Sequence, residues 1–367
     1  VLMATPEPPL DVFTEEFWTH SNIHLLSCSD VTAIDLPQQN VRLGSGEMLQ
    51  YEMCLIATGG EASTLQSIPP ATPNVHYIRT IEDARRLRVA LQAKPRVAII
   101  GGGFLGLEIA NSALATEASV TVIERATSLL DRFLPPEASE WLECKMCDAG
   151  VQLLLGISLH HAQSLSNGCT RLTTNVGDLE FDEVVVAIGL TPNDSLARDA
   201  SLDIATGGGI LVDAFCRTKN EHVFACGDCT SQLRSGQTAP TRLESWQNAN
   251  EQARTAAAAM LGIRRSTPKV PWFWTDQGKH NIQMLGLPAP DLKYVRRGDP
   301  ANDKMLWIGH RNSVPIHGVA INAGSDLRAI RPLFDREQPV SMEGFDLHAT
   351  NLRTWVKQLQ TDPTTTD

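Results

Sequence analysis

The chain has 367 residues, of which 42% are hydrophobic and 20% are charged, and its formal net charge at pH 7 is −11. This length and composition suit two or three folded domains and exclude an intrinsically disordered protein. The acidic charge argues against nucleic acid as a partner, because a phosphate backbone requires a basic surface, and no apolar run reaches the ~18 residues of a membrane span.

The first part of the chain predicts one short helix, Phe13 to His20, followed by β structure. The expected strands are Asn22 to Leu26, Val31 to Leu36, a hairpin of Val41 to Leu43 with Leu49 to Tyr51, and a buried strand that begins at Cys54 and ends in a glycine turn at Gly60. After a proline-rich link comes a strand at Val75 to Ile78. Thr80 and Asp83 then have the spacing of a capping box, which predicts the start of the next helix.

The stretch from Arg96 to Arg125 is the most informative part of the sequence. Val97 to Ile100 is an apolar run that ends in glycine, Phe104 to Ala118 has helical composition, and Val120 to Ile123 is a second apolar run. Gly101, Gly103 and Gly106 give G-x-G-x-x-G in this strand–turn–helix context, where the first permits a tight turn, the second lets a pyrophosphate approach and the third lets the helix pack closely. Amide hydrogens at the helix start, those of Phe104 and Leu105 included, then face the phosphates.

Glu124 ends the second of these strands, 18 positions after Gly106. A carboxylate at that place accepts hydrogen bonds from the ribose hydroxyls of a dinucleotide. Its charge repels a 2′-phosphate, so the sequence favours NAD(H) over NADP(H). A glycine-rich turn of some other α/β protein is the alternative interpretation of the motif.

The rest of the chain continues this alternation and then changes in composition. The sequence predicts a helix from about Pro136, strands at Val151 to Leu155, Ile157 to Gln163, Thr170 to Thr174, Asp178 to Phe181, from Val184 and from Val223 to Asp228, and an alanine-rich helix from Asn248 to Leu261. After Arg264 come short strands at Trp272 to Gln277, Gln283 to Leu285, Tyr294 to Arg296, Lys304 to Ile308 and Val314 to Ile321, and a last helix near Ala349 to Leu359. We therefore expect a separate α+β C-terminal domain.

Two further patterns bear on function. Eight cysteines without a secretory signal predict reduced thiols in a cytoplasmic protein, and the C-x-x-C pairs Cys144/Cys147 and Cys226/Cys229 lack the partner ligands of a metal site, so no metal is expected. The basic pairs Arg264-Arg265 and Arg296-Arg297 fit either a docking patch for an acidic protein or scattered solvated charge.

Taken in order, the motifs resemble a known family. They are Ala57-Thr-Gly59, Arg79-Thr-x-Glu-Asp83, Gly101 to Glu108, Ala187-Ile-Gly-Leu-x-Pro-Asn193, Gly227-Asp228, Glu244-Ser-Trp-x-Asn-Ala249 and Trp272-Phe-Trp-x-Asp-Gln277. The chain resembles the FAD-dependent pyridine-nucleotide oxidoreductases over nearly its whole length. The similar branch comprises the ferredoxin reductases of oxygenase systems, such as putidaredoxin reductase and biphenyl dioxygenase ferredoxin reductase, with apoptosis-inducing factor as a cousin.

The resemblance implies a fold and cofactor sites. The fold class is α/β, with two Rossmann-like nucleotide-binding domains and an α+β C-terminal domain. It implies an FAD-binding domain from residues 1–73 and 188–263, an NAD-binding domain from 74–187 and a C-terminal domain from 264–367. Asp228 is implied to bind the ribityl and pyrophosphate part of FAD, Arg79 to contact the flavin, Val31 the adenine end, and the backbone of Trp246 the pyrimidine edge. The other implied cofactor residues are Ala57, Thr58, Gly59, Gly189, Gly227, Glu244 and Ser245.

Two departures from the family pattern bear on this expectation. In the family the residue matching Glu108 approaches the flavin N5 region and pairs with the lysine of a P-P-L-S-K motif, whereas this chain has Pro8-Pro9-Leu10-Asp11-Val12. Family members also begin with a β-α-β unit that carries a first G-x-G-x-x-G, and this chain starts just before Pro8. We expect an N-terminally truncated sequence of an ordinary reductase rather than a chain with weak FAD binding.

The function implied is electron transfer from NADH through FAD to a small [2Fe–2S] ferredoxin that feeds an oxygenase. Glu108 and Trp274 are the expected catalytic residues, with Trp274 as the electron exit, and core packing of Trp272 and Trp274 is the alternative. The competing functions are an NADH oxidase or redox sensor similar to apoptosis-inducing factor, and a remnant that binds NAD without flavin. The protein is expected as a monomer or homodimer.

Overall fold

The computed structural model describes residues 2, 12–234, 237–346 and 351–361 of the chain. Apart from single residues at the start, the chain divides into two compact units. The first unit is formed by Met3–Glu61 with Leu190–Pro268, and the second by Ala62–Gly189 with Lys269–Asp367. The segment from Pro8 to Asp11, where the family's lysine motif is expected, lies outside the described residues.

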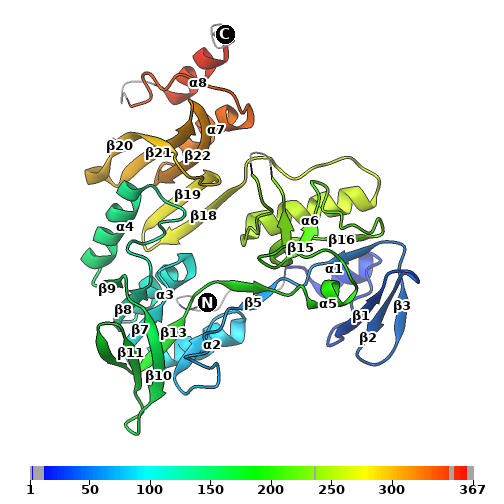
Figure 1. Cartoon of the computed structure of the whole chain (residues 1–367), viewed down its shortest axis with the longest axis horizontal. Coiled ribbons are helices and arrows are strands. Elements are labelled where there is room, and N and C mark those ends of the chain that lie inside the picture. Colours follow the sequence, from blue (N-terminus) through cyan, green and yellow to red (C-terminus); the bar gives the residue numbers. More distant parts are fainter. Residues whose placement is uncertain (1, 3–11, 235–236, 347–350, 362–367) are drawn as a thin grey trace. The chain divides into compact units, whose positions relative to one another are not determined.

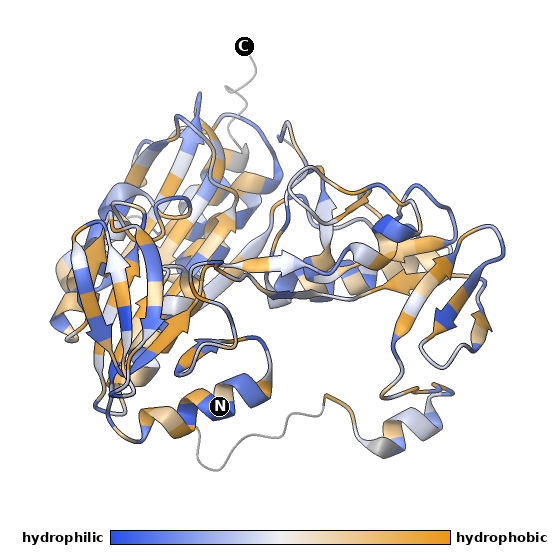
Figure 2. Cartoon of the chain, turned by 60° about the horizontal axis from the view of Figure 1, so that its bottom comes forward, coloured by the Kyte–Doolittle hydropathy of each residue, from blue (hydrophilic) through white to orange (hydrophobic). Residues whose placement is uncertain are grey.

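A five-stranded parallel sheet is the centre of the second unit. Its strands lie in the order β6 (Val75–Tyr77), β13 (Glu183–Val186), β7 (Arg96–Ile100), β8 (Ser119–Glu124) and β9 (Gln152–Leu155) (Figure 1). A parallel sheet is covered on both faces, so its strands are continuous apolar runs, and Val97, Ile99 and Val122 are fully buried. Figure 2 shows hydrophobic residues in many of the strands. All five strands end at the same edge, which is where ligands bind in such sheets.

Three helices pack with this sheet: α2 (Ile81–Leu91), α3 (Phe104–Leu114) and α4 (Pro136–Asp148). The predicted capping box of α2 is confirmed, because the Thr80 hydroxyl accepts from the Asp83 amide at 3.2 Å and the Asp83 carboxylate accepts from the Thr80 amide at 2.7 Å. The buried side of α3 faces β7 and β8 through Leu107 and Ala110. The turn between β7 and α3 is therefore fixed at one end by the buried strand and at the other by the packed helix.

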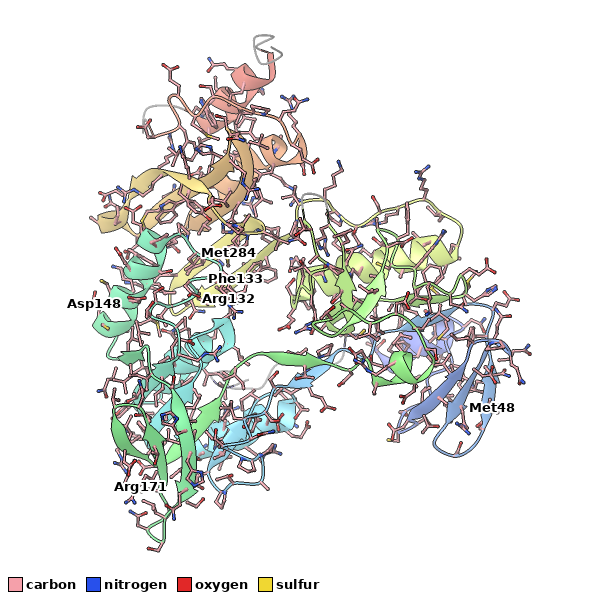
Figure 3. All side chains as sticks on the ribbon, viewed as in Figure 1. Met48, Arg132, Phe133, Asp148, Arg171 and Met284 are labelled. Carbon is pink, nitrogen blue, oxygen red and sulfur yellow. The ribbon has the colours of Figure 1, made fainter. Side chains whose placement is uncertain are left out.

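A three-stranded antiparallel sheet is inserted between β9 and β13. It consists of β10 (Leu159–Ser164), β11 (Thr170–Thr174) and β12 (Gly177–Phe181). Arg171, labelled in Figure 3, pairs with Glu180 across β11 and β12 at 2.8 Å.

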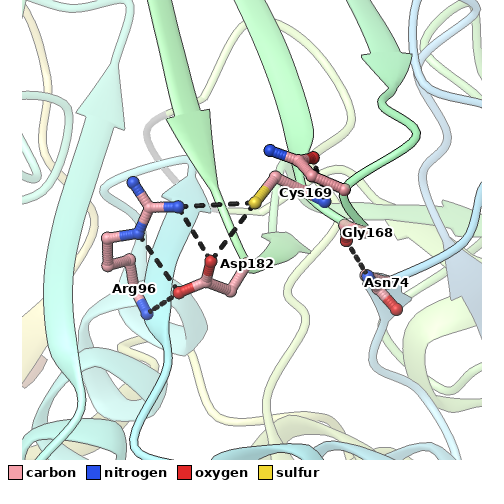
Figure 4. Close-up of polar contacts among 6 residues, drawn as sticks. Asn74, Arg96, Gly168, Cys169 and Asp182 are labelled. Atoms are coloured by element: carbon pink, nitrogen blue, oxygen red, sulfur yellow. Dashed lines mark hydrogen bonds and ion pairs between the residues drawn. The ribbon is translucent and has the colours of Figure 1, made fainter.

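Two contacts tie the inserted sheet to the parallel strands (Figure 4). Arg96, the first residue of β7, donates from Nη2 to Asp182 Oδ1 at 2.8 Å, and its backbone amide donates to Asp182 Oδ2 at 2.7 Å. Cys169 Sγ lies 3.5 Å from both Arg96 Nη2 and Asp182 Oδ1. Asn74 donates to the carbonyl of Gly168 at 2.6 Å.

The Arg96–Asp182 pair makes stability depend on pH. The hydrogen bond from Arg96 lowers the pKa of Asp182 from 3.8 to about 2, so the ionised carboxyl stabilises the fold above pH 3.8 and loses this effect as the pH falls through about 2. We expect Asp182→Asn to lower the free energy of unfolding near pH 7, with the difference from the wild type shrinking as the pH falls below about 4. Urea unfolding from pH 7 downwards measures this, with the exposed Asp178→Asn as control. A difference that stays constant with pH would contradict it.

A second five-stranded sheet, antiparallel throughout, forms the C-terminal part of the second unit. Its order is β18 (Trp272–Gln277), β19 (His280–Gly286), β22 (Val314–Ile321), β21 (Lys304–Arg311) and β20 (Lys293–Asp299). Its residues contribute to two cores. Met284 shares a buried cluster with Leu107 of α3, near Phe133 (Figure 3), whereas Leu285 faces α7 (Gly324–Asp335) and α8 (Leu352–Thr361). The sheet is therefore covered on both faces.

The first unit consists of small sheets around buried aliphatic residues. Its strands are β1 (Val31–Asp35), β2 (Asn40–Leu43) and β3 (Met48–Gln50) in one antiparallel sheet, β4 (Cys54–Ile56) parallel to β16 (Val223–Ala225), β15 (Ile210–Val212) parallel to β17 (Thr230–Gln232), and β5 (Gly60–Ala62) paired with β14 (Leu190–Pro192). Its helices are α1 (Glu15–His20), α5 (Ser195–Asp199) and α6 (Trp246–Met260). Ile34, Ile56 and Val223 lie in one buried cluster.

Most predicted elements are confirmed, including the C-terminal strands Trp272–Gln277 and Val314–Ile321, whose predicted bounds equal those of β18 and β22. The predicted strand at Asn22 to Leu26 is wrong, because these residues form no strand and have no ladder partner among the described residues, and Asn22 lies in a turn with φ of +53°. Helix α7 was not predicted, since Gly324 and Pro332 hide its apolar stripe. None of the helices in the described part of the chain combines the length and the apolar character needed to cross a lipid bilayer.

Candidate active site

The glycine turn after β7 is fixed by steric contacts with backbone. Gly101 has φ of +108°, and a Cβ there would lie 2.4 Å from the carbonyl oxygen of Ala187. A Cβ at Gly106 would lie 2.1 Å from the carbonyl oxygen of Gly101, so this glycine lets α3 pack on the turn. By contrast, a Cβ at Gly103 would meet no atom within 4 Å. Space is thus left open beside Gly103, where the motif requires a phosphate to approach.

Helix α3 starts at this open side without a side-chain cap. Its N-cap is Gly103, which has no side chain to accept from the first amides, and the first turn contains no acidic residue. The first four amides of a helix have no partner within the helix, and their partial positive charge attracts anions. The backbone amides of Phe104 and Leu105 belong to this first turn. The ring of Phe104 is used for packing, at 4.9 Å from Phe133 and 5.1 Å from Phe273.

Glu124 lies at the end of β8, next to the glycine turn. Its Oε2 accepts from the amide of Gly102 at 2.6 Å, and its Oε1 accepts from the amide of Ala126 at 2.7 Å. A carboxylate has about four lone-pair positions, so two backbone bonds leave it able to accept from two hydroxyls. The residue predicted from the sequence to bind ribose therefore also holds the turn in shape, a role that the sequence did not indicate.

Two further predicted residues lie at the same edge of the parallel sheet. Gly189 follows β13, has φ of +107°, and its carbonyl accepts from the amide of Ser63 at 3.0 Å. Arg79 is exposed and precedes α2, and its backbone amide donates to Asp83 at 2.9 Å. The structure therefore brings Gly101, Glu124 and Gly189 together and adds Arg79 on the adjoining strand end.

In the first unit, two predicted segments leave neighbouring parallel strands. Ala57, Thr58 and Gly59 follow β4, and Gly227-Asp228 follows β16, with the amide of Cys226 donating to the carbonyl of Ile56 at 3.0 Å. Gly59 and Gly227 have φ of +64° and +81°, conformations that favour glycine. Val31 lies on β1 and is exposed, while Ile34 of that strand packs with Ile56.

Helix α6 supports the turn that carries Asp228. Gln252, which is 1% exposed, accepts through Oε1 from the Gly227 amide at 2.8 Å and from the Thr230 hydroxyl at 3.0 Å. Asn248, on the same face of α6, donates to the carbonyl of Leu243 at 3.0 Å. Helix α6 thus connects the turn that carries Asp228 with Leu243, which lies just before the start of the helix. Neither Gln252 nor Asn248 is among the site residues predicted from the sequence, although Asn248 belongs to the motif from Glu244 to Ala249.

The helix start carries the remaining predicted residues of the first unit. Ser245 is the N-cap of α6 and accepts from the amide of Asn248 at 3.2 Å. Glu244 pairs with Arg242 at 2.9 Å. Trp246 is 69% exposed.

The contacts of Gln252 predict a measurable loss of stability. Gln252→Leu keeps a buried side chain of similar size but leaves the Gly227 amide without its acceptor, which should lower the free energy of unfolding by about 1–3 kcal/mol. Urea unfolding measures this against Asn250→Leu, a substitution at a partly exposed position of the same helix. Equal effects of the two substitutions would show that Gln252 does not hold the turn.

Glu108 and Trp274 lie in the second unit, on α3 and β18. Glu108 is half-buried and accepts from the Thr275 hydroxyl and the Asp276 backbone amide. Burial raises the pKa of Glu108, and these two hydrogen bonds oppose that increase. Trp274 is 38% exposed and stacks on Trp272, with ring centroids 5.3 Å apart.

The cysteines and arginine pairs have mainly structural surroundings. All eight cysteines are unpaired, and burial raises the pKa of Cys226 to about 11, which disfavours a reactive thiolate. Among the described residues no cluster of His, Cys, Asp and Glu is arranged to hold a metal ion. Three of the four arginines bind within their own unit: Arg265 to Glu251, Arg296 to Glu137, and Arg297 to the Phe345 carbonyl. These contacts favour internal ion pairing over a docking patch.

Comparison with known proteins places these features in context. The chain matches a family described as pyridine nucleotide-disulphide oxidoreductase over residues 5–253 and one described as reductase C-terminal over residues 272–356. A curated relative, the ferredoxin–NAD(+) reductase component of 3-phenylpropionate/cinnamic acid dioxygenase from Photorhabdus laumondii, is 35% identical over 333 residues, which cover 90% of this chain and 84% of the relative.

Two solved structures are also similar. The ferredoxin reductase for the CYP199A2 system of Rhodopseudomonas palustris has a TM-score of 0.90 and 29% identity, covering 97% of this chain and 88% of that one. The covalent putidaredoxin reductase–putidaredoxin complex gives a TM-score of 0.89 and 28% identity, covering 96% of this chain and 85% of that one.

Proposed function

We propose, because the chain belongs to the pyridine nucleotide-disulphide oxidoreductase family, that it transfers electrons from NADH through FAD to a ferredoxin of an oxygenase system. Its cofactors are FAD and NAD(H). The observation that carries the proposal is the sterically fixed glycine turn, open at Gly103 and flanked by Glu124, in a chain that matches ferredoxin reductases along its length.

The residues of the second unit fit NADH. The uncapped amides at the start of α3 are suited to its pyrophosphate, and Gly103 leaves room for it. Glu124 accepts from the adenosine ribose hydroxyls and repels a 2′-phosphate. Gly189, at the neighbouring strand end, lines the same edge.

The first unit provides groups that fit FAD. The turn at Gly227-Asp228 places a half-buried carboxylate next to the Ala57–Gly59 turn, and carboxylates accept from ribityl hydroxyls. Val31 is assigned to the adenine end and the segment Glu244–Trp246 to the pyrimidine edge. Arg79, which belongs to the second unit, is assigned to the flavin because of the family resemblance. When bound, FAD supplies the chemistry that converts a hydride into single electrons.

The chain's own residues have defined roles in this proposal. Glu108 is assigned to the flavin N5 region because of the family resemblance, and its carboxylate accepts from the Thr275 hydroxyl and the Asp276 amide of β18. Trp274 presents a partly exposed indole face and is the proposed exit for electrons to the partner. Orientation of the two cofactors, rather than proton transfer, is then the main contribution of the protein.

Partner and setting complete the proposal. The ferredoxin is of the [2Fe–2S] type, the protein is a monomer or homodimer, and the eight unpaired cysteines support a cytoplasmic location. The domains are residues 1–73 with 188–263 for FAD, 74–187 for NAD and 264–367 for the C-terminal domain.

Cytochrome c reduction tests this function. The purified protein should reduce cytochrome c with NADH only when a [2Fe–2S] ferredoxin of an oxygenase system is added, because the protein delivers single electrons to that carrier. NADPH should be a poor donor. Fast reduction without ferredoxin, or oxygen consumption that ferredoxin leaves unchanged, would instead support an NADH oxidase.

A further inference from the structure

The contacts of Glu108 form a buried chain of hydrogen bonds between α3 and β18. Glu108 Oε1 accepts from Thr275 Oγ1, Gln277 Nε2 lies 2.8 Å from Thr275 Oγ1, and Asn111 Nδ2 lies 3.2 Å from Gln277 Oε1. Thr275 and Gln277 are each 2% exposed. Because water is excluded from both side chains, their hydrogens have defined partners.

The direction of every bond in this chain follows from carbonyl neighbours. Gln277 Nε2 lies 3.3 Å from the carbonyl oxygen of Phe104, and a carbonyl only accepts, so this atom is the NH2 group. Asn111 Nδ2 lies 2.9 Å from the carbonyl oxygen of Leu107, which fixes the amide of Asn111 in the same way. Nε2 of Gln277 therefore donates to the Thr275 hydroxyl, and Oε1 of Gln277 accepts from the side-chain amide of Asn111.

A threonine hydroxyl has a single hydrogen, and the hydroxyl of Thr275 donates it to one acceptor. Since Thr275 accepts from Gln277, its own hydrogen is directed at the Glu108 carboxylate. The Asp276 amide is a second donor to that carboxylate. All donors thus converge on Glu108, an arrangement that favours the ionised carboxyl and fixes its position.

We propose that Thr275 is a positioning residue for Glu108, and that Gln277 and Asn111 orient the Thr275 hydroxyl so that Glu108 is held as an ionised acceptor. This inference rests on the proposed function for its catalytic meaning. The sequence has no lysine at the position where the family resemblance places one, and neutral donors from β18 take the role of partner.

The other charged groups near α3 either have their own hydrogen-bond partners or raise the pKa of Glu108. The negative charge of Asp276 on β18 raises the pKa of Glu108. The Asp276 carboxylate itself accepts from the side-chain amide of Asn281 at 2.7 Å. Glu124 on β8 is bound to two backbone amides. Arg96 begins β7, at the end opposite the glycine turn, and is paired with Asp182.

The direct test is a carbon NMR titration of protein labelled in the glutamate carboxyls, with the Glu108 signal assigned from Glu108→Gln. Thr275→Val should decrease the ionisation constant of Glu108 by on the order of tenfold, because one hydrogen bond to a charged group is lost. Thr275→Ser should restore the wild-type value, and Gln277→Leu should shift it in the direction of Thr275→Val. Thr170→Val is the matched control, since the buried Thr170 hydroxyl has no partner among the described residues.

A kinetic measurement separates this inference from the proposed function. In Thr275→Val the acid limb of the pH profile for flavin reduction by NADH should move to higher pH, and in Thr170→Val it should not. If wild-type flavin is not reduced by NADH, the proposed function fails while the titration still reports on Thr275. If wild-type flavin is reduced but Thr275→Val titrates as Thr170→Val does, the positioning role is refuted.

Discussion

Gly106→Ala should raise the dissociation constant for NADH by about a hundredfold, because misplacement of a binding element by about 1 Å has an effect of this size. The new Cβ would lie 2.1 Å from the carbonyl oxygen of Gly101, and neither atom belongs to a flexible side chain. Relief therefore requires α3 to move away from the turn, which carries its amides away from the pyrophosphate. Coenzyme titration measures the affinity, and thermal unfolding measures the accompanying loss of stability.

Two other glycines serve as controls for this substitution. A Cβ at Gly103 or at Gly207 meets no atom within 4 Å, so alanine at either position should leave the unfolding temperature nearly unchanged. Gly103→Ala should nevertheless weaken NADH binding, since the methyl group enters the space proposed for the phosphates, whereas Gly207→Ala should not. NADH binding by Gly106→Ala at wild-type affinity would refute the assignment of the turn.

Glu124→Arg should lower kcat/KM for NADH by about a hundredfold, which corresponds to about 3 kcal/mol of lost hydrogen bonds to a charged acceptor. The preference should shift towards NADPH because the repulsion of a 2′-phosphate is removed. The efficiency with NADPH should stay below that of the wild type with NADH, since the amides of Gly102 and Ala126 lose their acceptor.

Steady-state kinetics with both coenzymes measures this change, and Glu124→Gln is the matched variant. Glutamine keeps one acceptor oxygen for the turn and removes the charge, so its loss with NADH should be smaller than that of arginine. If the arginine variant used NADH as well as the wild type does, the ribose role of Glu124 would be wrong.

Local sequence patterns predicted the glycine turn and α2 because the signals lie within a few residues. The capping box of Thr80 and Asp83 and the spacing from Gly101 to Gly106 each describe one turn of backbone. The prediction of a strand at Asn22 to Leu26 was wrong because a strand does not depend on local signals alone. A strand requires a partner, and Ile23 and Leu25 are 44% and 57% exposed despite their β-like alternation.

Contacts between residues that are far apart in the sequence could not be predicted from local patterns. Thr275 lies 167 positions from Glu108, and no periodicity relates a strand of one sheet to a helix covering another. Gln252 is similarly 25 positions from Gly227. In α7 the residues Leu327, Ile330 and Leu333 have helical spacing, but Pro332 is normally a helix breaker, and the sequence therefore did not predict this helix.

An anaerobic titration of the purified protein tests the central claim most directly. A flavin absorption band should be present and should bleach on addition of about one equivalent of NADH, since one hydride carries the two electrons that reduce a flavin. The band should then return when an oxidised [2Fe–2S] ferredoxin of an oxygenase system is added. A flavin band that NADH leaves unchanged, or one that ferredoxin does not restore after bleaching, would contradict the account.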